Sequence, residues 1–157
     1  MTFPLLPRSQ WMRAIAAADE ARVVALAARL ASDLQATPSA PPRAGLALLR
    51  LRESVMLDTF YLGEIPVASA RVSLLAPDGR RVEGGAIVLD DSGDLAVALA
   101  VLDGVLAHDL PGARDVEGLL REGQAEIDGV ARVRGAMLAR TRVDFSLMAE
   151  VGNGDDA

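Results

Sequence analysis

Two short amphipathic helices are expected near the N-terminus, because apolar residues recur there at helical spacing. Trp11, Ile15 and Ala18 fall on one face of the first helix. Asp19 can cap a second helix, whose own apolar stripe follows it. Two helices in tandem also occur in DNA-binding helix-turn-helix proteins, but an acidic chain favours a packed helix pair. The pattern therefore predicts a helical arm over residues 9–35.

A proline-rich stretch, "ATPSAPPR", follows the helical arm and predicts an extended linker over residues 36–44. Beyond it the apolar period changes from that of a helix to that of a strand. Leucines alternate with arginines in "LLRLR", and "APDGR" is a turn sequence between two apolar-rich segments. Residues 45–89 are therefore expected to form about four strands, which are antiparallel because their connections are short.

Helical spacing returns toward the C-terminal end of the chain, over residues 92–150. Four leucines between Leu95 and Leu106 line one stripe of a helix that Asp91 or Ser92 can cap, and valines add a second stripe. A further helical pattern begins near Arg114. Three glycines weaken it, so one helix and two helices both remain possible interpretations.

The order of these elements predicts an α+β fold, in which a small antiparallel sheet of about four strands is flanked by N-terminal and C-terminal helices. A chain of 157 residues is expected to form a single domain, 1–157, ending in a flexible acidic tail over residues 151–157.

Composition excludes several kinds of chemistry. The chain has no cysteine, and therefore no thiolate metal site, disulfide or cysteine nucleophile of its own. All of its positive charge is arginine, so lysine nucleophiles and a P-loop lysine are also excluded. The formal net charge of −6 argues against nucleic-acid binding. The proline-broken N-terminus and the absence of a long apolar run predict a cytoplasmic protein with no membrane contact.

Candidate catalytic residues are few. The single histidine, His108, is expected at the end of a helix, where the helix dipole favours a cation. As a general base it would need an orienting partner, and Asp109 is adjacent in sequence, which rarely brings two side chains face to face. Glu122 and Glu126, one helical turn apart, could share a metal ion, but without a histidine or a second such pair a solvated acidic face is the favoured explanation.

Two other patterns each have two interpretations. Gly84-Gly85 precedes an apolar strand, which indicates a bulge or a close backbone approach and not a phosphate loop. Arg132, Arg134 and Arg140 are weak candidates for phosphate contacts, because guanidinium groups bind oxyanions in pairs. Ion pairs with neighbouring acids or another subunit would also account for them. With no internal active site, the surplus of apolar faces favours a subunit over an independent enzyme.

Four stretches of the chain resemble one known family. These are "RSQWMRAIAAAD", "FYLGEIPVASARVSL" with an expected turn at Gly63-Glu64, "LAVALAVLDGVLAH" and "ARTRVDFSLM". Together they resemble the phosphonate metabolism protein PhnG family, the G subunit of the bacterial carbon–phosphorus lyase core complex. The resemblance extends along nearly the whole chain. It implies a ribose 1-methylphosphonate 5-triphosphate synthase subunit that works with the H, I and J subunits.

In that family, the complex replaces the adenine of ATP by an alkylphosphonate, giving a ribose 1-phosphonate 5-triphosphate. The resemblance implies that an iron–sulfur cluster and S-adenosylmethionine belong to a partner subunit, and that this chain binds no cofactor or metal alone. It carries over no catalytic residue, so the chain is expected to be a supporting part of a transferase. The alternative is a free-standing dimeric small-ligand-binding or regulatory protein.

The C-terminal stretch has the features of a partner interface. Val143, Phe145 and Met148 are expected to be held by another subunit, while Arg142 and Asp144 set the register through ion pairs.

Trp11 is a further interface candidate. The alternative for both Trp11 and Phe145 is that they are ordinary core residues, since large aromatic residues serve both roles. If the chain is produced alone, it is expected to self-associate through these surfaces.

Overall fold

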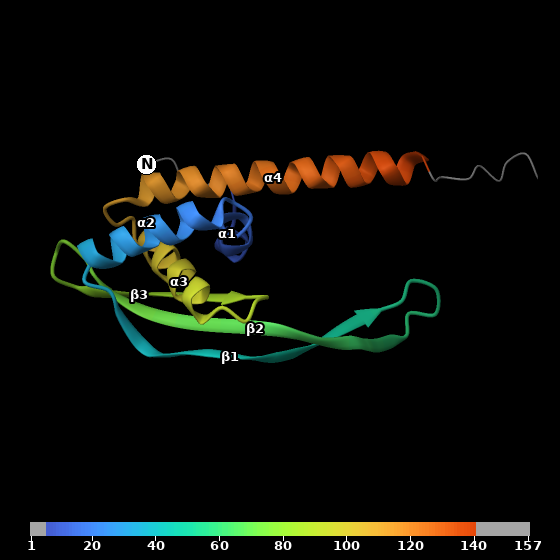
Figure 1. Cartoon of the computed structure of the whole chain (residues 1–157), viewed down its shortest axis with the longest axis horizontal. Helices are drawn as coiled ribbons and strands as arrows, with labels where there is room; N and C mark the ends of the chain where they lie inside the picture. Colours follow the sequence, from blue (N-terminus) through green and yellow to red (C-terminus); the bar gives the residue numbers. More distant parts are fainter. Residues whose placement is uncertain (1–5, 141–157) are drawn as a thin grey trace, which may run out of the picture. The chain divides into compact units, whose positions relative to one another are not determined.

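The computed structural model describes residues 6–140, and this part of the chain has an α+β fold. It holds four helices and one three-stranded antiparallel sheet of order β1-β2-β3 (Figure 1). The elements are α1 (Arg8–Ile15), α2 (Glu20–Asp33), β1 (Thr37–Arg52), β2 (Thr59–Leu75), β3 (Arg81–Val88), α3 (Gly93–Ala107) and α4 (Ala113–Arg140). The predicted fold class is confirmed, with three strands in place of about four.

The strand count differs because β2 is one long strand of 17 residues. The sequence suggested a turn at Gly63-Glu64, and that prediction is wrong. Gly63 pairs with Leu49 inside the ladder, at a register shift between Leu49 and Arg50. Its φ of +156° is one that side-chain-bearing residues rarely adopt, so the glycine marks an irregularity within a strand and not its end.

The proline-rich stretch is not a linker, because β1 begins at Thr37 and pairs with β2 from Ser73 onward. Its prolines fall on an edge strand, the one position in a sheet where a missing backbone N–H is tolerated. Register shifts between Pro38 and Ala40, and between Ala40 and Arg43, accommodate them.

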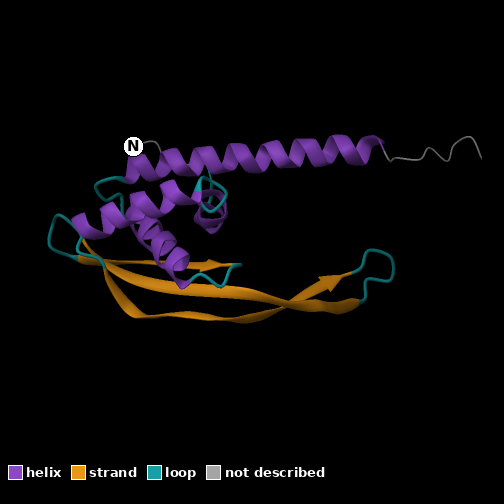
Figure 2. Cartoon of the chain, viewed as in Figure 1, coloured by secondary structure: helices purple, strands orange, loops and turns teal. Residues whose placement is uncertain are grey.

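One face of the sheet forms the core of the first of two compact units, residues 1–126. Alternate residues of β2 and β3 are buried there, including Val72, Leu74 and Val82. Helices α1, α2 and α3 lie over that face in this unit (Figure 2). Every position of α3 from Ala98 to Leu106 is buried, as its broad apolar circumference predicts.

A close backbone approach joins α3 to β3. A Cβ atom on Gly84 would lie 2.1 Å from the carbonyl oxygen of Ala100 and 2.5 Å from the nitrogen of Gly104. Only glycine fits at this position, and the close approach that the Gly84-Gly85 pair suggested is confirmed.

A buried carboxylate connects α1, α3 and β3. Asp103 on α3 is only 4% exposed. Its Oδ1 accepts a hydrogen bond from Arg8 Nε at 3.0 Å, and its Oδ2 accepts from Arg8 Nη2 at 2.6 Å. The backbone N–H of Gly85, on the edge strand, donates to the same Oδ2 at 3.0 Å. Both carboxylate oxygens of Asp103 therefore accept hydrogen bonds, and its charge is paired with the Arg8 guanidinium. A buried carboxylate is stable only when it is paired and hydrogen-bonded in this way.

The helix caps follow the sequence. Asp19 Oδ1 accepts from the backbone N–H of Arg22 at 2.9 Å, and Ser92 Oγ accepts from that of Leu95 at 3.1 Å. The last pattern forms one helix, α4, and not two. In the first unit α4 buries Val116 and Leu119, among others.

The second unit, residues 127–157, is described only as far as Arg140. There α4 exposes Val130, Val133 and Met137.

Candidate partner interface

Among residues 6–140, half of the β1–β2 hairpin has no third strand beside it. Strand β3 pairs with β2 only as far as Ala68, opposite Val88. From that point β1 and β2 continue alone to the turn (Figure 2). This segment is here named the ribbon: residues 45–52 of β1, 59–67 of β2 and the loop 53–58 between them.

The ribbon carries most of the large apolar side chains that the first unit leaves in solvent. Leu46 is 66% exposed, Leu48 62% and Tyr61 63%. The others on the ribbon are Leu51, Val55, Met56, Leu57, Phe60 and Leu62. Large apolar side chains concentrated in one exposed segment indicate an interaction site.

The ribbon also exposes backbone hydrogen-bonding groups. Strand β1 is an edge strand along its whole length, and among the described strands none pairs with the outer side of β2 at residues 59–67. A two-stranded ribbon is marginally stable by itself in water, and open edges readily accept another strand. The ribbon thus combines apolar faces with two free edges, and a partner could use either.

The loop at the end of the ribbon is ordered by its own hydrogen bonds. The Glu53 carboxylate accepts from the backbone N–H of Val55 at 2.7 Å and from that of Asp58 at 3.3 Å. These bonds, the one from Val55 above all, hold the pKa of Glu53 below its ordinary value of 4.5. Arg52 Nε donates to the carbonyl of Leu57 at 2.9 Å. The loop therefore holds a defined shape while Val55 and Met56 face solvent.

Trp11 lies in the core of the first unit. It is 8% exposed, and its indole Nε1 donates to the carbonyl oxygen of Leu6 at 2.8 Å. This is the core interpretation that the sequence allowed for a large aromatic residue. A contact between Trp11 and another subunit stays a prediction.

The other interface candidates, Arg142, Val143, Asp144, Phe145 and Met148, lie outside the described residues. The arginines proposed for phosphate contact lie on the second half of α4, where Arg132 Nε donates to the carbonyl of Asp128 at 3.3 Å. Arg134 and Arg140 are exposed on the same segment. The phosphate contacts of these arginines and the interface role of the C-terminal stretch stay predictions.

Two of the remaining chemical candidates, His108 and Glu122, have structural partners. His108 caps the end of α3, and its Nε2 lies 3.1 Å from the carbonyl oxygen of Glu83. Glu122 forms an ion pair with Arg22 of α2 and is thus engaged within the first unit. Between residues 6 and 140, no three histidine or acidic side chains are grouped so that they could hold a metal ion. None of the helices described is long and apolar enough to cross a lipid bilayer.

Sequence reasoning did not identify the ribbon as a candidate site. The signal was present in "GLALLRLR", where leucines occupy both strand faces: Leu46 and Leu48 on one, Leu49 and Leu51 on the other. A strand with one face in a core and one in water shows simple alternation, so apolar residues on both faces indicate a second covering layer.

These features define a class of protein: a small α+β protein whose first unit, as far as it is described, exposes most of its large apolar side chains on a β-ribbon. The chain belongs to the family of the phosphonate metabolism protein PhnG, whose model matches residues 6–150. The match places it in phosphonate metabolism. A direct comparison with curated proteins found no match.

Proposed function

We propose that this chain is the G subunit of a carbon–phosphorus lyase core complex, assembled with H, I and J subunits. In that complex it supports the coupling of an alkylphosphonate to ATP with displacement of adenine. The product is a ribose 1-phosphonate 5-triphosphate. Family membership supports the pathway, and the subunit role is inferred from the ribbon.

The ribbon is the observation that carries this proposal. Its leucines and its tyrosine are exposed to solvent, which is unfavourable for large apolar side chains. Among the described residues, its two strands also have no neighbouring strand on their outer edges. A subunit packed on the ribbon would bury these apolar side chains and could also pair with the open strand edges. The C-terminal residues Val143, Phe145 and Met148 are proposed as a second contact, with Arg142 and Asp144 fixing its register.

Chemistry in the complex is assigned to the partners. We assign the iron–sulfur cluster and S-adenosylmethionine to a partner subunit, as the family resemblance implies, and a chain without cysteine is consistent with that assignment. ATP is a substrate of the whole complex. The chain itself is proposed to position its partners in the cytoplasm, and not to catalyse a step alone.

Co-expression with the H, I and J subunits, followed by native mass determination, tests this proposal. A stoichiometric complex that contains this chain is expected. A well-behaved free chain, present while the other three assemble without it, would contradict the subunit role. A stable homodimer in that experiment would favour the regulatory alternative instead.

A further inference from the structure

A groove of about 460 Å³ lies on the sheet face that α1, α2 and α3 leave uncovered. Strand β1 contributes Ala40, Pro41 and Arg43, while β2 and β3 contribute Ser69, Ala70, Arg71, Gly85, Ala86 and Ile87. Its volume lies within the range of roughly 300–1,000 Å³ that is usual for small-molecule sites. It belongs entirely to the first unit.

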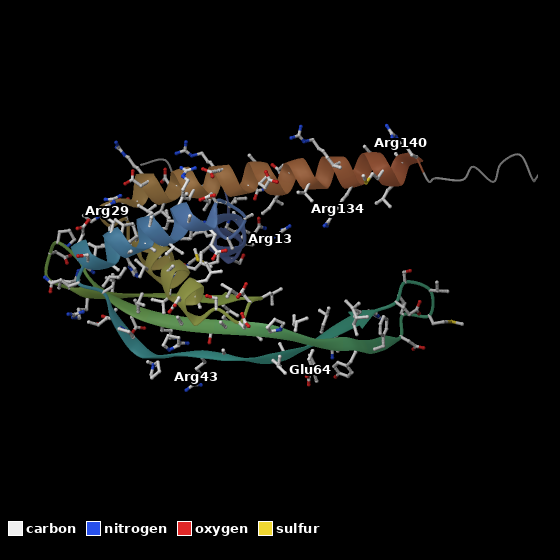
Figure 3. All side chains as sticks on the ribbon, in the orientation of Figure 1. Arg13, Arg29, Arg43, Glu64, Arg134 and Arg140 are labelled. Carbon is white, nitrogen blue, oxygen red and sulfur yellow. The ribbon has the colours of Figure 1, made fainter. Side chains whose placement is uncertain are left out.

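The bulge in the proline stretch creates this groove. Ala40 pairs with Arg71 and Arg43 pairs with Ser69, so three steps along β1 match two along β2. Residues three apart on a regular strand point to opposite faces, but the extra residue turns Ala40 and Arg43 to the same face. In Figure 3, Arg43 points away from the helices.

Small residues form the floor between the two arginines. Gly85 pairs with Arg71 across the β2–β3 ladder, and the Cγ of Arg71 lies 3.7 Å from where a Cβ of Gly85 would be. Arg43 lies opposite Ser69, two residues from Arg71 along β2, which makes the two arginines diagonal neighbours. Such neighbours lie about 7–8 Å apart at the backbone, so the guanidinium groups of two long side chains can both reach one bound anion.

The charge in the groove is unbalanced. No acidic residue lines it, and within residues 6–140 neither Arg43 nor Arg71 forms an ion pair. The nearest acid in the register is Glu83, whose carboxylate accepts from Ser39 Oγ at 3.3 Å. In a chain with a net charge of −6, two unpaired guanidinium groups in one hollow are unusual.

We propose that this groove binds a phosphate or phosphonate group of a small molecule. Arg43 and Arg71 would donate to its oxygens, and the Ser69 hydroxyl would be a further donor. Pro41 and Ile87, which is 72% exposed, would contact the apolar part of the ligand. The site is distinct from the ribbon, and its assignment to a phosphonate or a nucleotide tail rests on the proposed function.

Titration calorimetry on the full-length chain tests this site, with inorganic tripolyphosphate as one probe and methylphosphonate as the other. The first probe represents a nucleotide tail and the second an alkylphosphonate. Arg43→Gln and Arg71→Gln should each weaken binding at least about tenfold, since each removes charge-assisted hydrogen bonds. Arg13→Gln on α1 removes the same charge from an exposed position outside the groove, and should leave the affinity unchanged.

Thermal unfolding of the three variants should match the parent, because all three arginines are exposed. The site assignment is overturned if neither probe binds the parent chain. It is equally overturned if Arg13→Gln weakens binding as much as the groove variants do. If neither probe binds but Arg43→Gln and Arg71→Gln prevent co-purification with partners, the groove holds an acidic protein segment instead of a small anion.

Discussion

Replacing two ribbon leucines by threonine, Leu46→Thr with Leu48→Thr, should separate folding from assembly. Burying a whole leucine side chain contributes about 1.5–3 kcal/mol. Because these two are 66% and 62% exposed, only about one third of that gain is made in the free chain. The double substitution should therefore cost about 1–2 kcal/mol of folding free energy at most, and threonine keeps the strand preference.

The assembled state should be affected much more. If a partner covers the ribbon, the remaining two thirds of each leucine contributes about 1–2 kcal/mol to binding. The pair then contributes about 2–4 kcal/mol, which corresponds to a dissociation constant raised about 30- to 700-fold. The free energy of unfolding, measured in urea, and the affinity for the co-expressed partners should thus change by clearly different amounts.

Val24→Thr is the matched control, because Val24 is an exposed aliphatic residue, 43% accessible, on α2 and outside the ribbon. It should leave partner affinity unchanged. Equilibrium pull-down over a range of partner concentrations gives the affinities. If the leucine variant binds partners as tightly as the parent, the ribbon is not the interface, whatever else assembles.

Three further predictions concern the contact of Gly84 with α3, the ion pair of Arg8 with Asp103 and the loop held by Glu53. Gly84→Ala should cost about 3 kcal/mol of stability in urea unfolding, because its Cβ would meet α3 backbone at 2.1 Å, whereas Gly85→Ala should be mild, with its nearest contact at 3.6 Å. Asp103→Asn should cost about 1–2 kcal/mol, and a double-mutant cycle with Arg8→Gln should recover that value as coupling; simple additivity would refute the ion pair. The lowered pKa of Glu53 means that its ionised form stabilises the loop above pH 4.5, and this is lost as pH falls through the lower folded value. Amide exchange in the loop should therefore rise on acidification in the parent and be insensitive to pH, after correction for intrinsic rates, in Glu53→Gln.

Much of the first unit could be predicted because its signals are local. Asp19 and Ser92 cap helices in the structure as their sequence positions suggest, since a capping side chain bonds to a backbone N–H three residues away. The turn in "APDGR" is also local: Gly79 takes a φ of +83° that glycine favours. Such interactions need nothing from distant parts of the chain.

The misread elements depend on distant neighbours. In the sequence, the prolines of β1 indicate a linker. In the structure they belong to an edge strand, which pairs with β2 on one side only and therefore tolerates the missing backbone N–H groups. Gly63 was expected in a turn, and only its pairing with Leu49 shows that it lies inside a strand. The groove was not predicted at all, because Arg43 and Arg71 are 28 positions apart and only the bulge in the register puts them on the same face of the sheet.

The sequence by itself determined the helix periods, the caps, the α+β class, the absence of cysteine chemistry and the family to which the chain belongs. Only the tertiary structure decided where the pairing of strands stops. That stopping point leaves the ribbon without a third strand among the described residues. The packing of α1, α2 and α3 on one side of the sheet, which the sequence did not show either, leaves the other face of the described sheet open for the groove. The physical reason is that the apolar period and the caps of a helix depend on residues a few positions apart. The exposure of a strand or a sheet face depends instead on which distant segments of the chain pack against it.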